Sequence, residues 1–349
     1  MDSAGLGATT KPDSGVSRWL LALWALTLIM VAVGGITRLT GSGLSMVDWK
    51  PLMGAIPPLT DQAWRDVFAQ YQQSPQFQLV NHWMGLGDFK RIFLWEYVHR
   101  LLGRTIGVCF LLPYIYFLAT RRLRGRAVLR TAIAFILGGA QGLLGWYMVK
   151  SGLVDRPEVS HLRLAAHLSL AFFVGQYLLW LALDFRPYSP SPTIEPSPAS
   201  WLAWPLLWVL ISIQIIFGAF MAGLRAGVLS STFPDINGLY LPSHFFRFPS
   251  LWDNLINNPL AVHWTHRALG FVVAFAVVAM TIPLLRAKPT RSQTIGSALL
   301  LAATGAQFLL GVATVMLGVP IWMAVCHQVG AYLLLSSAVG LGYLVLHSR

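Results

Sequence analysis

Cysteine is scarce in this chain, which has only Cys109 and Cys326 among its 349 residues. Both lie in long apolar runs, but Cys109 is deep within its run and Cys326 is near one end of another. A disulfide needs Cα atoms within about 7 Å of each other, so we expect none between these two. Two thiols also cannot supply the four thiolates of an iron–sulfur cluster or of a structural zinc site. Imidazole is therefore left as the main metal ligand.

Charged residues are also scarce. Only 11% of the chain is Asp, Glu, Lys or Arg, whereas 56% is hydrophobic and the mean hydropathy is +0.61. A soluble core cannot bury that much apolar surface, so lipid must cover it. We expect an all-α integral membrane protein, because about 20 apolar residues in a helix cross about 30 Å of hydrocarbon. Eight runs of suitable length lie at 18–38, 94–119, 128–149, 161–184, 201–223, 259–285, 293–317 and 321–346.

Acidic residues are few, and the 13 of them leave a net charge of +12. The excess of Lys and Arg gathers in short connections around 121–130 and 286–291, where positive charge marks the cytoplasmic side. We therefore attribute it to topology rather than to nucleic acid binding. With eight spans, both termini are expected in the cytoplasm, and the long loops at 39–93 and 224–258 face the other side. The first 17 residues resemble neither a cleaved signal nor a transit peptide, which favours the bacterial plasma (inner) membrane.

The chain matches itself in two places. Residues 96–103 (EYVHRLLG) align with 263–270 (HWTHRALG), and 139–145 (GAQGLLG) align with 305–311 (GAQFLLG) at almost the same offset. Two matches at one offset indicate a duplication. Because each half has four helices, the halves are expected to be parallel repeats related by an axis along the membrane normal. We interpret the small residues of the second match as helix-packing positions. The predicted organisation is a cytoplasmic tail at 1–17, a four-helix half at 18–184, a Pro-rich cytoplasmic linker at 185–200 and a second four-helix half at 201–349.

Four histidines lie near the outer ends of the second, fourth, sixth and eighth runs: His99, His167, His266 and His327. Polar groups are costly in hydrocarbon and usually face the interior of a bundle. Two imidazoles at equal depth on alternate helices can oppose each other across a bundle core, as axial ligation of haem iron requires. The simplest scheme pairs His99 with His167 and His266 with His327. These four residues are thus the predicted metal ligands of two haem sites.

Other interpretations of the histidines stay open. A single His in a helix is more often a hydrogen-bonded structural residue than a ligand. His263 shares a helix face with His266, so this pair is a candidate for copper or zinc. A catalytic zinc, however, needs three close protein ligands, and carboxylates near these positions are too few for a hard metal ion.

The two halves differ three residues before the first ligand candidate, where Glu96 in the first half corresponds to His263 in the second. Glu96 should face the same cavity as His99, where a carboxyl can act as acid, base or charge stabiliser. The asymmetry predicts chemistry in the first half and a permanent cofactor in the second. The alternative is that Glu96 bonds to a neighbouring helix or arginine at an interface. Arg100 and Arg267 follow their histidines and either pair with haem propionates or extend to the lipid headgroups.

These motifs resemble the haem A synthase family. The resemblance rests on Glu96-x-x-His99-Arg100, on His266-Arg267 in the second half, on the later His167 and His327, and on residues 34–45 (GGITRLTGSGLS). It runs from about residue 18 to residue 346 and is strongest toward the proteobacterial and mitochondrial branch. Members of another branch carry cysteine pairs in outer loops, which this chain lacks, so a disulfide-linked mechanism is not expected.

The resemblance implies oxidation of the C8 methyl of haem O to the formyl group of haem A, through successive hydroxylations and loss of water from a geminal diol. By the same resemblance, His99 and His167 would address the substrate haem, His266 and His327 would ligate haem b, and Glu96 would be the carboxyl near the reacting methyl. The implied partners are haem O, a haem O synthase, an electron donor and membrane lipid, with homo-oligomerisation left open. The competing function is a di-haem b-type electron carrier linked to quinone, which has little need of Glu96.

Overall fold

The computed structural model describes residues 12–47, 56–152, 158–186 and 198–347, and in these residues the chain is built from helices. Eight of the helices are long and apolar enough to cross a membrane, as predicted. The prediction was wrong at one boundary, because the second span begins at Leu86 rather than near residue 94. The eight are α1 (Ser14–Leu39), α3 (Leu86–Ala119), α4 (Arg126–Gly152), α5 (His161–Asp184), α6 (Pro198–Gly223), α8 (Pro259–Arg286), α9 (Arg291–Met316) and α10 (Ile321–Leu346).

Local capping fixes several of the helix ends. At the start of α1, the Asp13 carboxylate accepts hydrogen bonds from the backbone N–H groups of Gly15 and Val16, which have no partner within the helix. The same carboxylate is ion-paired with Arg122, in the turn after α3. The Arg122 guanidinium is the main cause that lowers the pKa of Asp13 to about 2. This pair ties the start of α1 to the basic turn between α3 and α4.

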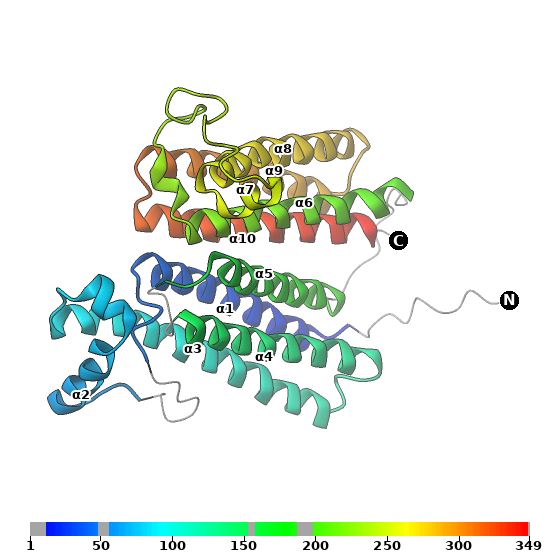
Figure 1. Cartoon of the computed structure of the whole chain (residues 1–349). Helices are drawn as coiled ribbons and strands as arrows, with labels where there is room; N and C mark the ends of the chain where they lie inside the picture. Colours follow the sequence, from blue (N-terminus) through cyan, green and yellow to red (C-terminus); the bar gives the residue numbers. More distant parts are fainter. Residues whose placement is uncertain (1–11, 48–55, 153–157, 187–197, 348–349) are drawn as a thin grey trace.

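The eight long helices form two sets of four (Figure 1). Helices α1, α3, α4 and α5 make one set, and α6, α8, α9 and α10 make the other, while α1, α5, α6 and α10 meet between them. Helix α1 begins and α10 ends at the same end of the molecule. This arrangement fits the predicted pair of four-helix repeats.

Helix α10 joins the two sets. On its face toward α1, the side-chain amide of Gln328 donates to the carbonyl of Val31 at 3.0 Å, and the Tyr332 hydroxyl donates to the carbonyl of Trp24 at 3.1 Å. The Trp24 indole donates in turn to Ser336. Such interhelical bonds hold helices together where lipid gives no hydrophobic drive for association. The two halves are therefore hydrogen-bonded to each other through α1 and α10.

The long connections between α1 and α3 and between α6 and α8 contain short helices that the apolar pattern did not indicate. These are α2 (Asp61–Gln72), a π-helix (Phe77–Asn81), a 3₁₀-helix (Ala226–Leu229) and α7 (Leu251–Asn257). Tyr71, Phe89 and Phe93 form a buried aromatic cluster between α2 and the first turns of α3. Trp64 packs edge-on against Phe93, with 5.1 Å between the ring centres. The cluster explains why α3 extends beyond its apolar stretch.

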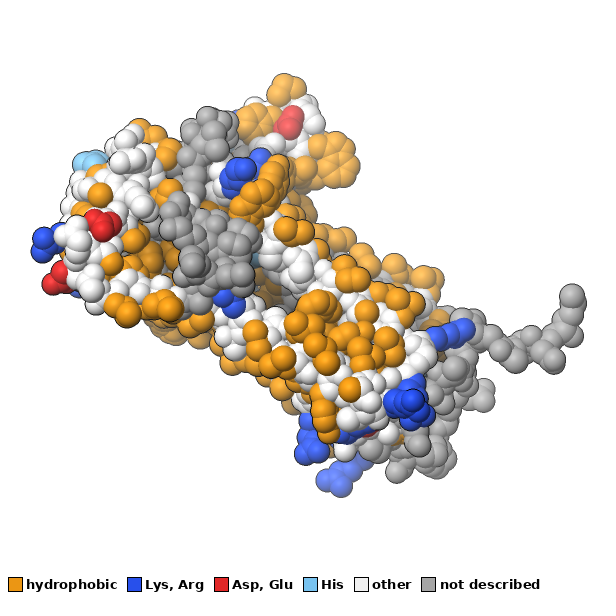
Figure 2. Space-filling model, turned by 90° about the horizontal axis from the view of Figure 1, so that it is seen from below, with side chains coloured by type: hydrophobic (Ala, Val, Ile, Leu, Met, Phe, Trp, Pro, Cys, Tyr) orange, Lys and Arg blue, Asp and Glu red, His pale blue; other side chains and the backbone are white. Residues whose placement is uncertain are grey.

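The surface is consistent with a membrane setting. Figure 2 shows apolar side chains over the middle of the face seen from below. Basic side chains gather at the right-hand end, where Figure 1 places the turn between α3 and α4, and acidic and basic side chains mix at the other end. Most of the predicted tail at 1–17 and of the Pro-rich linker at 185–200 lies outside the described residues, so these two parts of the domain prediction remain expectations.

Candidate functional site

The structure brings the predicted histidines together in pairs, one pair in each half. In the second half, the ring centres of His266 and His327 lie 6.3 Å apart, with the ring planes at 84°. Two bonds of about 2 Å from a metal to imidazole nitrogens, plus about 1 Å from each nitrogen to its ring centre, separate two ring centres by about 6 Å. In the first half, His99 and His167 are close enough to interact electrostatically. The spacing in the second half thus fits two imidazoles on a single metal ion.

Each imidazole lies over a glycine of the preceding membrane-spanning helix. A Cβ atom at any of these glycines would come within 3.2 Å of the facing ring, closer than van der Waals contact allows. The ring positions therefore depend on the missing side chains. The facing pairs are Gly34 on α1 with His99, Gly145 on α4 with His167, Gly218 on α6 with His266, and Gly311 on α9 with His327.

Three glutamines bind the main chain of the histidines. The side-chain amide of Gln141 donates to the carbonyl of His167 at 2.9 Å, and those of Gln214 and Gln307 donate in the same way to His266 at 3.0 Å and His327 at 2.9 Å. These glutamines were not among the predicted site residues. For Gln141 and Gln307 the signal was present in the duplicated Gly-Ala-Gln segments, which we had attributed to helix packing alone.

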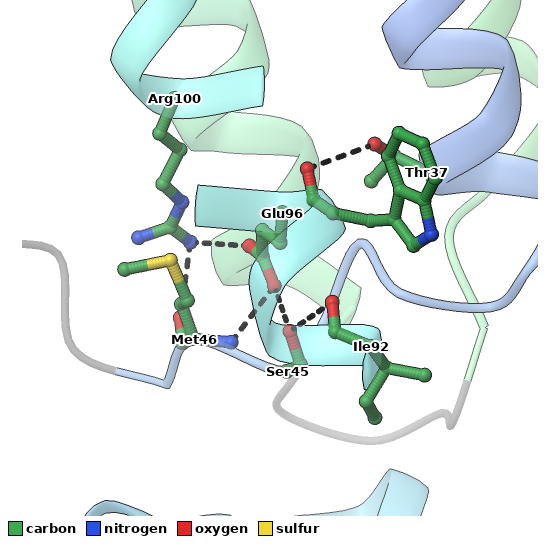
Figure 3. A network of polar contacts seen from close by, with 7 residues as sticks. Thr37, Ser45, Met46, Ile92, Glu96 and Arg100 are labelled. Atoms are coloured by element: carbon green, nitrogen blue, oxygen red, sulfur yellow. Dashed lines mark hydrogen bonds and ion pairs between the residues drawn. The ribbon is translucent and has the colours of Figure 1, made fainter. Parts of the chain in front are cut away.

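The Glu96 carboxylate lies in a closed network of hydrogen bonds with Arg100, Ser45 and Met46 (Figure 3). Its side chain is buried, and one oxygen accepts from Arg100 at 2.6 Å. The other oxygen accepts from the Ser45 hydroxyl at 2.7 Å and from the backbone N–H of Met46 at 2.8 Å. Arg100 also donates to the Met46 carbonyl at 3.0 Å. Glu96 and Arg100 together hold the segment after α1 against α3. Such contacts were expected under the alternative in which Glu96 bonds to a neighbouring helix or arginine at an interface.

Arg100 and Arg267 each contact the backbone of the long connection in their own half. The Arg100 side chain is only 12% exposed. Arg267 donates through Nη1 to the carbonyls of Thr232 at 2.8 Å and Asp235 at 2.6 Å. Within the described part of the chain, its Nε and Nη2 atoms are buried and have no hydrogen-bond partner. Nε and Nη2 form one edge of the guanidinium, and this edge can donate two parallel hydrogen bonds to a carboxylate.

His263 occupies the place in the second half that Glu96 has in the first. It is fully buried, and neither ring nitrogen has a hydrogen-bond partner among the residues that the structure describes. The same residues include no cluster of three or more His, Cys, Asp or Glu side chains that could hold a metal ion. The His263–His266 pair therefore lacks the third protein ligand that a catalytic zinc site needs.

Eight apolar helices in two sets, each with two neighbouring histidines, define a multi-pass membrane protein with a histidine pair in each half. The chain matches the family model COX15-CtaA, described as cytochrome oxidase assembly protein, over residues 17–339. It belongs to this family.

Curated relatives match almost the whole chain. A protein of Parvibaculum lavamentivorans is 41% identical over 96% of this chain and 96% of its own length. One of Nitrosospira multiformis is 40% identical over 95% of this chain and 93% of its own length, and one of Caulobacter vibrioides is 41% identical over 95% and 96%. All three are named heme A synthase. The predicted family is thereby confirmed.

Proposed function

We propose that this chain is a haem A synthase, an oxidoreductase that converts the C8 methyl of haem O to the formyl group of haem A. The observation that carries this proposal is the identity of about 40% to proteins named heme A synthase over nearly the full length of both chains. The multi-pass helical fold and the two opposed imidazole pairs support it, because haem is a hydrophobic substrate that needs axial ligands inside a bundle.

The second half is the proposed site of a resident haem b. The 6.3 Å between the ring centres of His266 and His327 fits axial ligation of one iron, and Gly218 and Gly311 give both rings room. The buried Nε and Nη2 atoms of Arg267 suit a propionate. When bound, haem b supplies a one-electron redox centre. His263 occupies the position that Glu96 has in the first half, so the second half has no carboxylic acid at this position.

The first half is the proposed substrate site. His99 and His167 would bind the iron of haem O and so fix the height of the ring in the bundle. Glu96, three residues before His99, is the proposed catalytic carboxyl. Its three hydrogen-bond donors hold it in one orientation relative to the helix that carries His99. Arg100, which is bonded to Glu96, is proposed to bring positive charge near a propionate.

The proposed setting is the bacterial plasma (inner) membrane, with both termini in the cytoplasm and both haem sites toward the periplasmic side. It is supported by the basic residues at the α3–α4 turn and by the positions of the histidines near the opposite helix ends. Proposed partners are a haem O synthase, which supplies the substrate, and an electron donor. The domain division into a substrate half at 18–184 and a haem b half at 201–349 follows the two imidazole pairs.

Pigment extraction tests this function. The full-length protein, purified from membranes of cells that also produce a haem O synthase, should yield haem b together with haem O and haem A, identified by mass. The matched control is the same protein from cells without haem O synthase, which should yield haem b alone. Haem b alone from both preparations would contradict the synthase and favour the di-haem electron carrier.

A further inference from the structure

One arrangement around the histidines repeats four times, once for each pair of helices that carries a ligand histidine. In every pair, the first helix carries a glycine under the imidazole and a second contact residue one turn before that glycine. In three pairs this second residue is a glutamine, and in the fourth it is a methionine. The four segments are Met30-x-x-x-Gly34, Gln141-x-x-x-Gly145, Gln214-x-x-x-Gly218 and Gln307-x-x-x-Gly311.

The three glutamines make one kind of contact. Each donates its side-chain N–H to the main-chain carbonyl of the histidine on the facing helix, at 2.9 to 3.0 Å. Their Oε1 atoms are buried and have no hydrogen-bond partner in the described part of the chain. The carboxamide of Gln141 also lies beside the imidazole of His167, with Nε2 atoms 3.4 Å apart. Because the bond is to the backbone, it fixes the height of the histidine's own helix turn.

Met30 occupies the corresponding place beneath His99. Its terminal methyl would lie 3.4 Å from a Cβ atom at Gly103, one turn after His99. In the second half, the amide nitrogen of Gln214 would lie 3.6 Å from a Cβ atom at Gly270, one turn after His266. The two side chains thus occupy equivalent positions. A thioether has no N–H to donate, so the His99 turn lacks the bond that the other three turns have.

We propose that Gln141, Gln214 and Gln307 are positioning residues that fix the ligand histidines, and that Met30 leaves His99 as the ligand that releases haem. This inference rests on the proposed function, in which one haem is turned over and the other is kept. The second half, with two fixed ligands, retains its haem. The first half, with one fixed ligand and one that can move, exchanges its haem as substrate and product. Hydrogen bonds that fix the positions of the ligand residues increase the affinity of a site for its metal.

Haem release distinguishes the two halves without any measurement of activity. Full-length protein loaded with haem b is mixed with excess apomyoglobin, and transfer is followed by absorption. Wild-type protein should release haem in a fast and a slow phase, and His99→Ala should remove the fast phase. Met30→Gln should slow the fast phase about fivefold, roughly the factor expected from one net hydrogen bond. Gln214→Met and Gln307→Met should each accelerate the slow phase by about the same factor.

The control is Gln141→Met, which exchanges the same two side chains in the first half and should accelerate only the fast phase. A fast phase that Met30→Gln leaves unchanged or accelerates would overturn the inference. Slow-phase rates unaffected by both Gln214→Met and Gln307→Met would overturn it as well. Slower release cannot come from simple damage to the fold, so Met30→Gln is informative even if the glutamine variants are unstable. Wild-type protein that binds no haem in either half would instead contradict the proposed function.

Discussion

Replacement of Glu96 by Gln is expected to reduce haem A formation by about 10²–10⁴-fold, the usual contribution of a catalytic acid or base, while the haem b absorption stays in place. The amide is close in size to the carboxyl and can still accept from Ser45 through its oxygen, but it cannot ionise or carry a proton. The second half lies on other helices and does not use Glu96. The measurement is haem A per mole of bound haem b, extracted from membranes that contain haem O.

Two further variants separate the chemistry of Glu96 from its structural contacts. Ser45→Ala removes one donor at 2.7 Å and keeps the carboxyl, so it should reduce haem A formation by less than about tenfold, the effect of one hydrogen bond to a charged group. Glu96→Ala should retain haem b and form no haem A. Equal losses in Ser45→Ala and Glu96→Gln would mean that Glu96 only anchors the segment after α1. Full turnover in Glu96→Ala would favour the electron carrier.

Loss of either second-half ligand is expected to abolish the stable b-type absorption. His266→Ala and His327→Ala each remove one of the two imidazoles that stand 6.3 Å apart, and a single remaining ligand cannot hold iron with the same low-spin spectrum. Substrate haem should still bind through His99 and His167, because that pair lies in the other set of helices. The measurement is the reduced-minus-oxidised spectrum of purified protein, before and after addition of haem O.

The reciprocal variants provide the control. His99→Ala and His167→Ala should keep the b-type absorption and lose the additional signal that haem O produces. If a change at any one of the four histidines removed both signals equally, the sites would be shared between the halves rather than separate. Such a result would also contradict the division of labour inferred from Glu96 and His263.

The sequence was sufficient to predict the eight spans and the grouping of the histidines. Apolar runs determine where a chain can cross a membrane, so the ends of α5, α8 and α10 were placed closely. The start of α3 was missed because its first turns are amphipathic and pack on the aromatic cluster with Tyr71 rather than on lipid. Helix α2 was missed for a related reason, since its apolar face is covered by Phe77 and by the first turns of α3 rather than by lipid.

Other features depend on contacts between distant segments. Nothing local indicates that Glu96 binds Ser45 and Met46, which precede it by about fifty residues, so the carboxyl was expected in the cavity rather than in a closed network. The role of Gln307 was likewise hidden, because its partner is a backbone carbonyl on the next helix. Its match with Gln141 in the duplicated segments was the only available signal.

A density map of the pigment-bearing protein tests the central claim most directly, since the claim concerns where the imidazoles point. The account predicts one planar tetrapyrrole in each four-helix half, with its iron between His99 and His167 in the first and between His266 and His327 in the second. A map in which these ring nitrogens face lipid, or in which a single tetrapyrrole lies between the halves, would contradict it.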